Sequence, residues 1–175
     1  PTRGQIDVVV QRYRRHTISN ITTSLCLFEI LYRSNVWTRS MDVAVIDPSG
    51  FTPPYDHHFC EGLATQGCRV TLYTSGDWEG WPAETYTREP HFYAQTNRLP
   101  DSIADSPLHT GIKGIEHVQD MTRLLLRLRR RAPDIIHVQW LPLPLVDTAY
   151  VYALNRVAPT VFTVHDSNPF HGAPT

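Results

Sequence analysis

Two short apolar runs near the end of the chain constrain its fold most. Residues 135–139 read IIHVQ and residues 160–164 read TVFTV, and the segment between them is long enough for one helix. Short runs rich in β-branched residues and bounded by turn residues are typical of interior strands of a parallel sheet. Polar residues follow each run directly, and ligands of such sheets bind beyond the carboxyl ends of the strands. The sequence therefore predicts a functional site at that edge of the sheet.

The same alternation of strand and helix extends back to Met41. The predicted strands are short apolar runs at 42–47, 69–74, near 91–94, 135–139 and 160–164. The predicted helices lie between them at 55–66, 112–131 and 145–156. This order predicts a Rossmann-like α/β fold, with a mostly parallel sheet, right-handed crossovers and helices on both faces.

The predicted helix 112–131 has the clearest periodicity. One side of it carries the apolar residues Ile115, Val118, Met121, Leu125 and Leu128 at helical spacing. Arginines crowd its last turn, where positive charge suits the helix dipole, and Pro133 ends it. We expect the apolar side to face the sheet.

Composition excludes several classes of protein. The net charge of −1 does not favour nucleic acid as a partner. The three cysteines form no C-x-x-C pair, which favours a reduced, cytoplasmic chain over a disulfide scaffold. No run of 18 apolar residues is present, so no spanning helix is predicted.

Residues 1–40 differ from the rest of the chain. They carry six arginines against two acidic residues and show little periodicity, so we interpret them as an upstream extension of uncertain order. One interpretation is that they precede a natural start at Met41. The other is a basic extension that touches a membrane surface, which would place the protein peripherally at the inner face of the membrane.

The loop after the first predicted strand, residues 48–54, precedes a helix. Rossmann-like folds hold phosphates or sugars there, against backbone N–H groups and a helix N-terminus. Neither G-x-G-x-x-G nor a P-loop is present, since only Gly50 occurs in this loop, and this argues against a dehydrogenase and an NTPase. A proline-rich turn that only links two elements is an equal alternative.

No metal site is predicted. His57 and His58 are adjacent, so on a helix they point in different directions and form a poor chelate. No H-E-x-x-H and no cluster of histidine and cysteine with zinc spacing occurs.

His165 is the strongest candidate for catalysis. It ends a predicted strand and is followed by Asp166 and Asn168, so it could exchange a proton or hydrogen bond with a substrate hydroxyl. The alternative is a strand-end histidine bonded to a backbone carbonyl. Trp140 could form an apolar rim for a ligand or belong to ordinary core, whereas His137 is predicted to pack against a helix.

Four segments together resemble a known family. They are MDVAVIDPSG from Met41, His58–Thr74, PDIIHVQW from Pro133 and PTVFTVHD from Pro159. In this order they resemble the amino-terminal domain of GT-B glycosyltransferases of family 4, the glycosyl transferases group 1 type. The resemblance covers about residues 41–175.

The resemblance implies a fold and a function. Such enzymes have two Rossmann-like domains, an amino-terminal one that holds the acceptor and a carboxy-terminal one that binds the nucleotide sugar, and they need no metal. Gly50 would lie near the donor phosphate and the acceptor, with Tyr55 and His57 beside it, and His165 would line the sugar site. The function that the resemblance implies is acceptor binding in a retaining hexosyltransferase for a cell-surface polysaccharide or glycolipid.

The chain also departs from the family. No two glutamates are spaced as in E-x7-E, and the basic pair that grips the diphosphate belongs to the donor-binding domain. We therefore expect residues 41–175 to be an acceptor-side domain that is cut short, inactive in sugar transfer without its donor-binding partner domain. A non-catalytic Rossmann-like binding module is the alternative.

Overall fold

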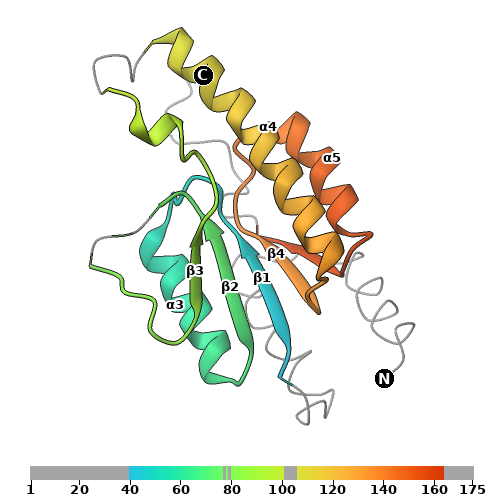
Figure 1. The fold of residues 1–175 in the computed structure, drawn as a ribbon. Helices are drawn as coiled ribbons and strands as arrows, with labels where there is room; N and C mark the ends of the chain where they lie inside the picture. Colours follow the sequence, from blue (N-terminus) through green and yellow to red (C-terminus); the bar gives the residue numbers. More distant parts are fainter. Residues whose placement is uncertain (1–39, 77, 79, 101–105, 164–175) are drawn as a thin grey trace, which may run out of the picture. The chain divides into compact units, whose positions relative to one another are not determined.

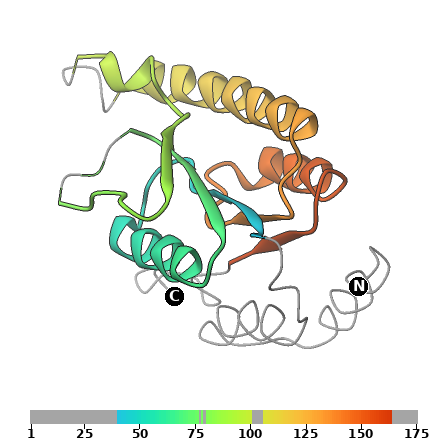
Figure 2. The ribbon, with the colours of Figure 1, turned by 60° about the horizontal axis from the view of Figure 1, so that its bottom comes forward.

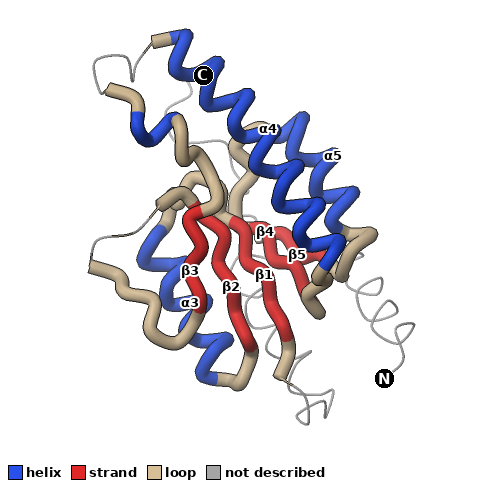
Figure 3. Tube along the Cα trace, in the orientation of Figure 1, coloured by secondary structure: helices blue, strands red, loops and turns tan. Residues whose placement is uncertain are grey.

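The described part of the chain contains one parallel sheet (Figure 1). The computed structural model describes residues 40–76, 78, 80–100 and 106–163. The strands pair in the order β3-β2-β1-β4-β5, and every pair is parallel. Their bounds are β1 Asp42–Ile46, β2 Arg69–Thr74, β3 Thr87–Pro90, β4 Ile135–Val138 and β5 Thr160–Phe162. The predicted parallel sheet is confirmed (Figure 3).

Helices cover both faces of this sheet (Figure 2). Helix α3 (Pro53–Thr65) lies on one face, and α4 (Pro107–Arg130) and α5 (Pro144–Leu154) lie together on the other. Each of the three begins with proline in its first turn, where the missing N–H costs no hydrogen bond. A short 3-10 helix, η1 (Thr96–Arg98), follows β3. The Rossmann-like α/β class is therefore confirmed.

The alternation of side chains along β1 and β4 explains why both faces need a helix. Ala44, Ile46 and Ile136 belong to the hydrophobic cluster that includes Met121 and Leu124 of α4. Side chains that alternate with these point to the opposite face. One of them, His137, packs its ring edge-to-face against Phe59 of α3, with ring centroids 4.6 Å apart. His137 thus packs against a helix, as expected.

Two predicted strands need correction. The strand expected near 91–94 is wrong, because β3 ends at Pro90 and both His91 and Phe92 donate their N–H groups to the Thr74 carbonyl. Tyr93 has a φ of 59°, which is incompatible with a strand. The run 160–164 was expected inside the sheet, yet β5 pairs only with β4 and lies at the edge of the described sheet.

The buried side of α4 also differs from the expectation. Ile115 is 64% exposed and Val118 is 39% exposed, although Met121 and Leu128 are buried as predicted. The positions that turn inward instead carry the polar residues Glu116, His117 and Asp120. Hydropathy predicts that such residues face water, so the pattern misplaced the first half of the helix.

In the part of the chain that the structure describes, no helix is long and apolar enough to cross a membrane. Residues 1–39 and 164–175 lie outside the described residues, and so do the predictions made for them.

Replacing Leu124 by alanine should destabilise the protein strongly. Leu124 is fully buried between α4 and the sheet, and removal of such a side chain costs about 2–5 kcal/mol of unfolding free energy. Leu108→Ala on the same helix is the matched control, because Leu108 is 67% exposed. Urea unfolding followed by circular dichroism measures both, and equal losses would contradict this packing.

Candidate functional site

A buried carboxylate shapes the loop after β1. Asp47 is fully buried, and its carboxylate accepts backbone hydrogen bonds from Ser49 (3.2 Å), Gly50 (3.0 Å) and Phe51 (3.0 Å). Three donors on one carboxylate bend the chain tightly. Gly50 adopts a φ of +59° in this bend, a conformation that glycine adopts at little cost.

Gly50 also allows a close approach by Trp78. A Cβ atom at position 50 would lie 2.9 Å from Trp78 Nε1 and 3.3 Å from Thr74 Oγ1, closer than packed atoms tolerate. Trp78 is itself covered by Arg88, whose Cζ lies 4.6 Å from the ring centroid. The sequence analysis did not select Trp78, because nothing in its glycine-rich surroundings indicates that it folds back onto residue 50.

An aromatic pair joins this loop to the end of β4. The rings of Phe51 and Trp140 meet edge-to-face with centroids 5.3 Å apart, and Trp140 Nε1 donates to Thr52 Oγ1 at 3.3 Å. Phe51 is 60% exposed, whereas Trp140 is half-buried. The structure thus brings the Gly50 loop and Trp140 together at the carboxyl edge, where β1 and β4 are neighbours.

Tyr55 and His57, the two predicted site residues on α3, point in different directions. Tyr55 lies in the first turn, partly exposed, and stacks on Phe59 at 6.2 Å. His57 is buried against Trp81 and Tyr86 of the segment between β2 and β3, and its Nδ1 lies 3.1 Å from the Tyr86 hydroxyl. His57 therefore contacts the 81–86 segment and not the Phe51–Trp140 pair.

Polar groups at the same edge retain hydrogen-bonding capacity. The Gln139 backbone N–H donates to the Ile46 carbonyl at 2.8 Å, but neither side-chain amide atom of Gln139 has a partner among the described residues. Thr74 Oγ1, at the end of β2, also has none there. Both side chains are fully buried, and buried polar groups are normally paired. Beneath the carboxyl edge, these buried groups therefore keep unused hydrogen-bonding capacity.

Asp56 holds a proton at neutral pH. Burial, followed by the hydrogen bond and negative charge of neighbouring Asp47, raises the pKa of Asp56 to about 9. Its backbone N–H donates to the Thr52 carbonyl at 3.0 Å, so α3 starts directly behind the loop. Asp56 is consequently neutral, beside the Asp47 side chain that holds the loop.

A buried chain of hydrogen bonds approaches the loop from the α4 side. Asp147 Oδ1 lies 2.6 Å from His117 Nε2, and His117 Nδ1 lies 2.8 Å from the Tyr93 hydroxyl. Burial raises the pKa of Tyr93 to about 12, although a hydrogen bond with Ser49 opposes the increase. The chain thus links the start of α5, the middle of α4 and the loop after β1.

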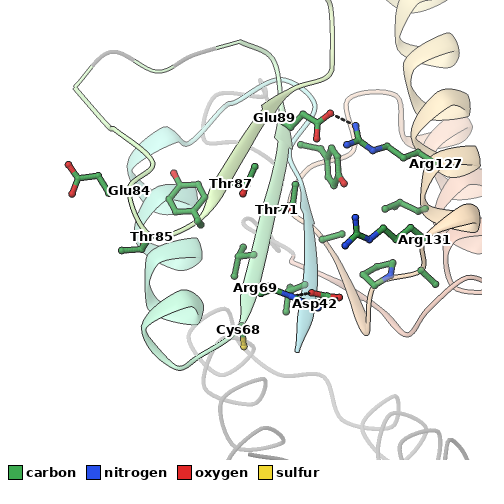
Figure 4. Close-up of a pocket in the computed structure, with 18 residues that line it drawn as sticks. Asp42, Cys68, Arg69, Thr71, Glu84, Thr85, Thr87, Glu89, Arg127 and Arg131 are labelled. Carbon is green, nitrogen blue, oxygen red and sulfur yellow. Dashed lines mark hydrogen bonds and ion pairs between the residues drawn. The ribbon is translucent and has the colours of Figure 1, made fainter. Parts of the chain in front are cut away.

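A pocket of about 560 Å³ lies elsewhere, on the sheet face beside β2, β3 and the end of α4 (Figure 4). Two of its arginines are already paired, Arg69 with Asp42 and Arg127 with Glu89. None of the predicted site residues lines it. We therefore place the candidate site at the carboxyl edge.

His165, Asp166 and Asn168 lie outside the described residues. The strand that precedes them, β5, is parallel to β4, so the chain leaves β5 toward the same edge as Gln139 and Trp140. The residues that sequence reasoning missed at this edge are Asp47, Phe51, Thr52, Thr74 and Trp78. Asp47 and Phe51 lie close to Gly50 in the sequence. The prediction of Gly50 as a site residue could therefore have been extended to them.

The Asp56→Asn variant should flatten the dependence of stability on pH. The folded state keeps a proton that the unfolded carboxyl releases above about pH 4, so this group lowers the unfolding free energy as pH rises from about 4 to 9. Its contribution is up to about 1.4 kcal/mol per pH unit. Chemical unfolding at pH 5 and pH 8 should therefore show a smaller loss for Asp56→Asn than for the wild type. Glu84→Gln, an exposed carboxylate, is the control and should keep the wild-type slope.

Comparison with known proteins identifies the family of the chain. The family described as a glycosyl transferase 4-like domain matches residues 53–175, which include α3, β2 to β5 and the end of β4 that carries Trp140. No curated protein matches the chain. The match spans well over half of the 175 residues. The chain therefore belongs to the glycosyl transferase 4-like domain family.

Proposed function

We propose that this chain forms the acceptor-binding side of a glycosyltransferase that uses a nucleotide-sugar donor. One observation carries the proposal: in a chain of this family, the exposed Phe51 and the half-buried Trp140 meet over the loop that Asp47 holds. The acceptor would be a cell-surface polysaccharide or a glycolipid, and the enzyme would act in the cytoplasm, at the inner face of the membrane where the acceptor is lipid-linked.

The chemistry of this edge suits a sugar. A sugar ring has apolar C–H faces and a rim of hydroxyl groups, so it needs aromatic surface beside hydrogen-bonding groups. Phe51 and Trp140 supply the aromatic surface. Thr74 and Gln139 keep unused hydrogen-bonding capacity in the buried layer beneath it, at the ends of strands β2 and β4 on either side of β1. Tyr55, partly exposed at the start of α3, extends the aromatic surface on the helix side.

The catalytic role belongs in this proposal to His165, with Asp166 and Asn168 as further contacts of the sugar. The direction of β5 supports it, because β5 is parallel to β4 and its last residue, Phe162, pairs with Val138 at the end of β4. The donor and its diphosphate would bind a second domain, and the transfer, with retention of configuration, would need no metal.

Trp140→Ala should weaken binding of the acceptor. Loss of a central aromatic contact typically costs about 1–3 kcal/mol, or roughly tenfold to 100-fold in affinity. The chain would first be screened on a glycan array, and the best oligosaccharide would then be titrated by calorimetry. Tyr152→Ala is the matched control, because Tyr152 is an exposed aromatic residue on α5. Equal affinities of both variants and the wild type would remove the Phe51–Trp140 pair from the site.

His165→Ala should abolish most turnover in the protein that combines this domain with its donor-binding domain. Sugar transfer to the oligosaccharide found above would be measured with a panel of radiolabelled nucleotide sugars. Unchanged turnover would remove His165 from the mechanism. Glycan binding without transfer from any nucleotide sugar, even in the wild type, would instead identify a non-catalytic binding module.

A further inference from the structure

Three metal-ligating side chains converge on α3, beside the segment between β2 and β3. The side chains of His57, His58 and Glu61 each offer one donor atom, and these atoms all lie within 4.8 Å of one another. His57 Nε2 lies 3.6 Å from Glu61 Oε2, and His58 Nδ1 lies 3.7 Å from the same oxygen. The cluster is separate from the Phe51–Trp140 pair and has no part in the proposed transfer.

Helix geometry explains the convergence. Adjacent residues diverge around a helix, which is why the two histidines alone predict no chelate. Glu61, however, is four residues after His57 and three after His58, so it lies one turn away from both. The two histidines therefore form a chelating set only together with Glu61, whose carboxylate faces both imidazoles.

The surroundings of His57 resemble those of a metal ligand. Its Nδ1 lies 3.1 Å from the Tyr86 hydroxyl, which leaves Nε2 to face Glu61. A hydrogen bond to the second ring nitrogen fixes the orientation of ligating histidines. Arg88 Nη2 donates to the same hydroxyl at 3.0 Å and so holds it in place. The Trp81 ring packs against both imidazoles, with centroids 5.3 Å from His57 and 5.4 Å from His58.

Two of the three ligand separations are close to those around a tetrahedral ion, and the two imidazole nitrogens lie within 4.8 Å of each other. Zinc binds histidine nitrogen and carboxylate oxygen at about 2.0–2.2 Å, which separates two tetrahedral ligands by about 3.4 Å. The observed 3.6 and 3.7 Å need to shorten by only a few tenths of an ångström. The side chain of His57 is 10% exposed, so its orientation is fixed by packing. The side chain of His58 is 66% exposed and is free to rotate toward the ion.

We propose that His57, His58 and Glu61 bind one Zn²⁺ ion, with the fourth position open to water or to a further ligand. Two imidazoles and one carboxylate are a ligand set that zinc uses in proteins. In the bound state, Nδ1–H of His57 donates to the Tyr86 hydroxyl oxygen. Because His57 packs on Trp81 and Tyr86, the ion would fix α3 to the segment between β2 and β3.

The test is a titration of the whole chain, without a polyhistidine tag, with Zn²⁺ alone by calorimetry. We expect one ion per chain and a rise in Tm, because an ion that binds the folded state stabilises it. Substituting Co²⁺ should give the visible absorption of a four-coordinate ion. His58→Ala and Glu61→Gln should abolish binding, and Tyr86→Phe should weaken it by about 10–100-fold.

His109→Ala and Glu84→Gln are the matched controls. His109 meets Ser106 through its backbone N–H rather than its ring, and Glu84 is exposed on the 81–86 segment, so both variants should bind Zn²⁺ as the wild type does. Circular dichroism checks that each variant is folded. Failure of the wild type to bind Zn²⁺, or wild-type affinity in folded His58→Ala and Glu61→Gln, would overturn the proposal.

Discussion

The carboxylate of Asp47 is the interaction on which the carboxyl edge depends. It accepts three successive backbone N–H groups and so fixes the loop between β1 and α3. That loop sets the left-handed turn at Gly50, the position of Phe51 against Trp140 and the start of α3. Burial, followed by the hydrogen bond and charge of Asp47, raises the pKa of the neighbouring Asp56, so Asp56 keeps a proton and the two buried carboxyl groups avoid mutual repulsion.

Helix α4 plays a second organising part, through polar residues rather than apolar ones. Its Glu116 accepts hydrogen bonds from the backbone of Gln95 at 2.7 Å and of Thr96 at 2.8 Å. Burial alone would raise the pKa of Glu116, but hydrogen bonds from Thr96 and from these N–H groups lower it. Asp120 accepts from the Tyr93 N–H at 3.0 Å. The stretch from Tyr93 to Thr96, which follows β3, is therefore held by two carboxylates of α4.

Sequence reasoning succeeded where burial and periodicity coincide. The runs at β1, β2 and β4 are short, apolar and bounded by turn residues, so their places and their parallel pairing followed from pattern alone. The prediction of the buried side of α4 was wrong, because Glu116 and His117 are buried by hydrogen bonds to residues that are distant in the sequence. Hydrophobic periodicity carries no information about hydrogen bonds between residues about 20 or 30 positions apart. It therefore predicts that Ile115 and Val118 are buried, although both are exposed.

The candidate site shows the same division. Gly50 and Trp140 could be selected because each follows a predicted strand, and parallel strands end at a common edge. Trp78 could not, since its contact with Gly50 depends on a turn within a segment without periodicity. Likewise, the direction of His57 depends on Tyr86, which lies 29 residues away.

The composition of β3 has a consequence for self-association. This strand lies at one edge of the described sheet, next to β2 alone, and reads Thr87, Arg88, Glu89, Pro90. An exposed edge invites another chain to add a strand, yet proline has no N–H to offer and charged side chains oppose close stacking. Arg127 holds Glu89 in an ion pair from α4. The four residues of β3 therefore disfavour the addition of a strand from another chain at this edge of the described sheet.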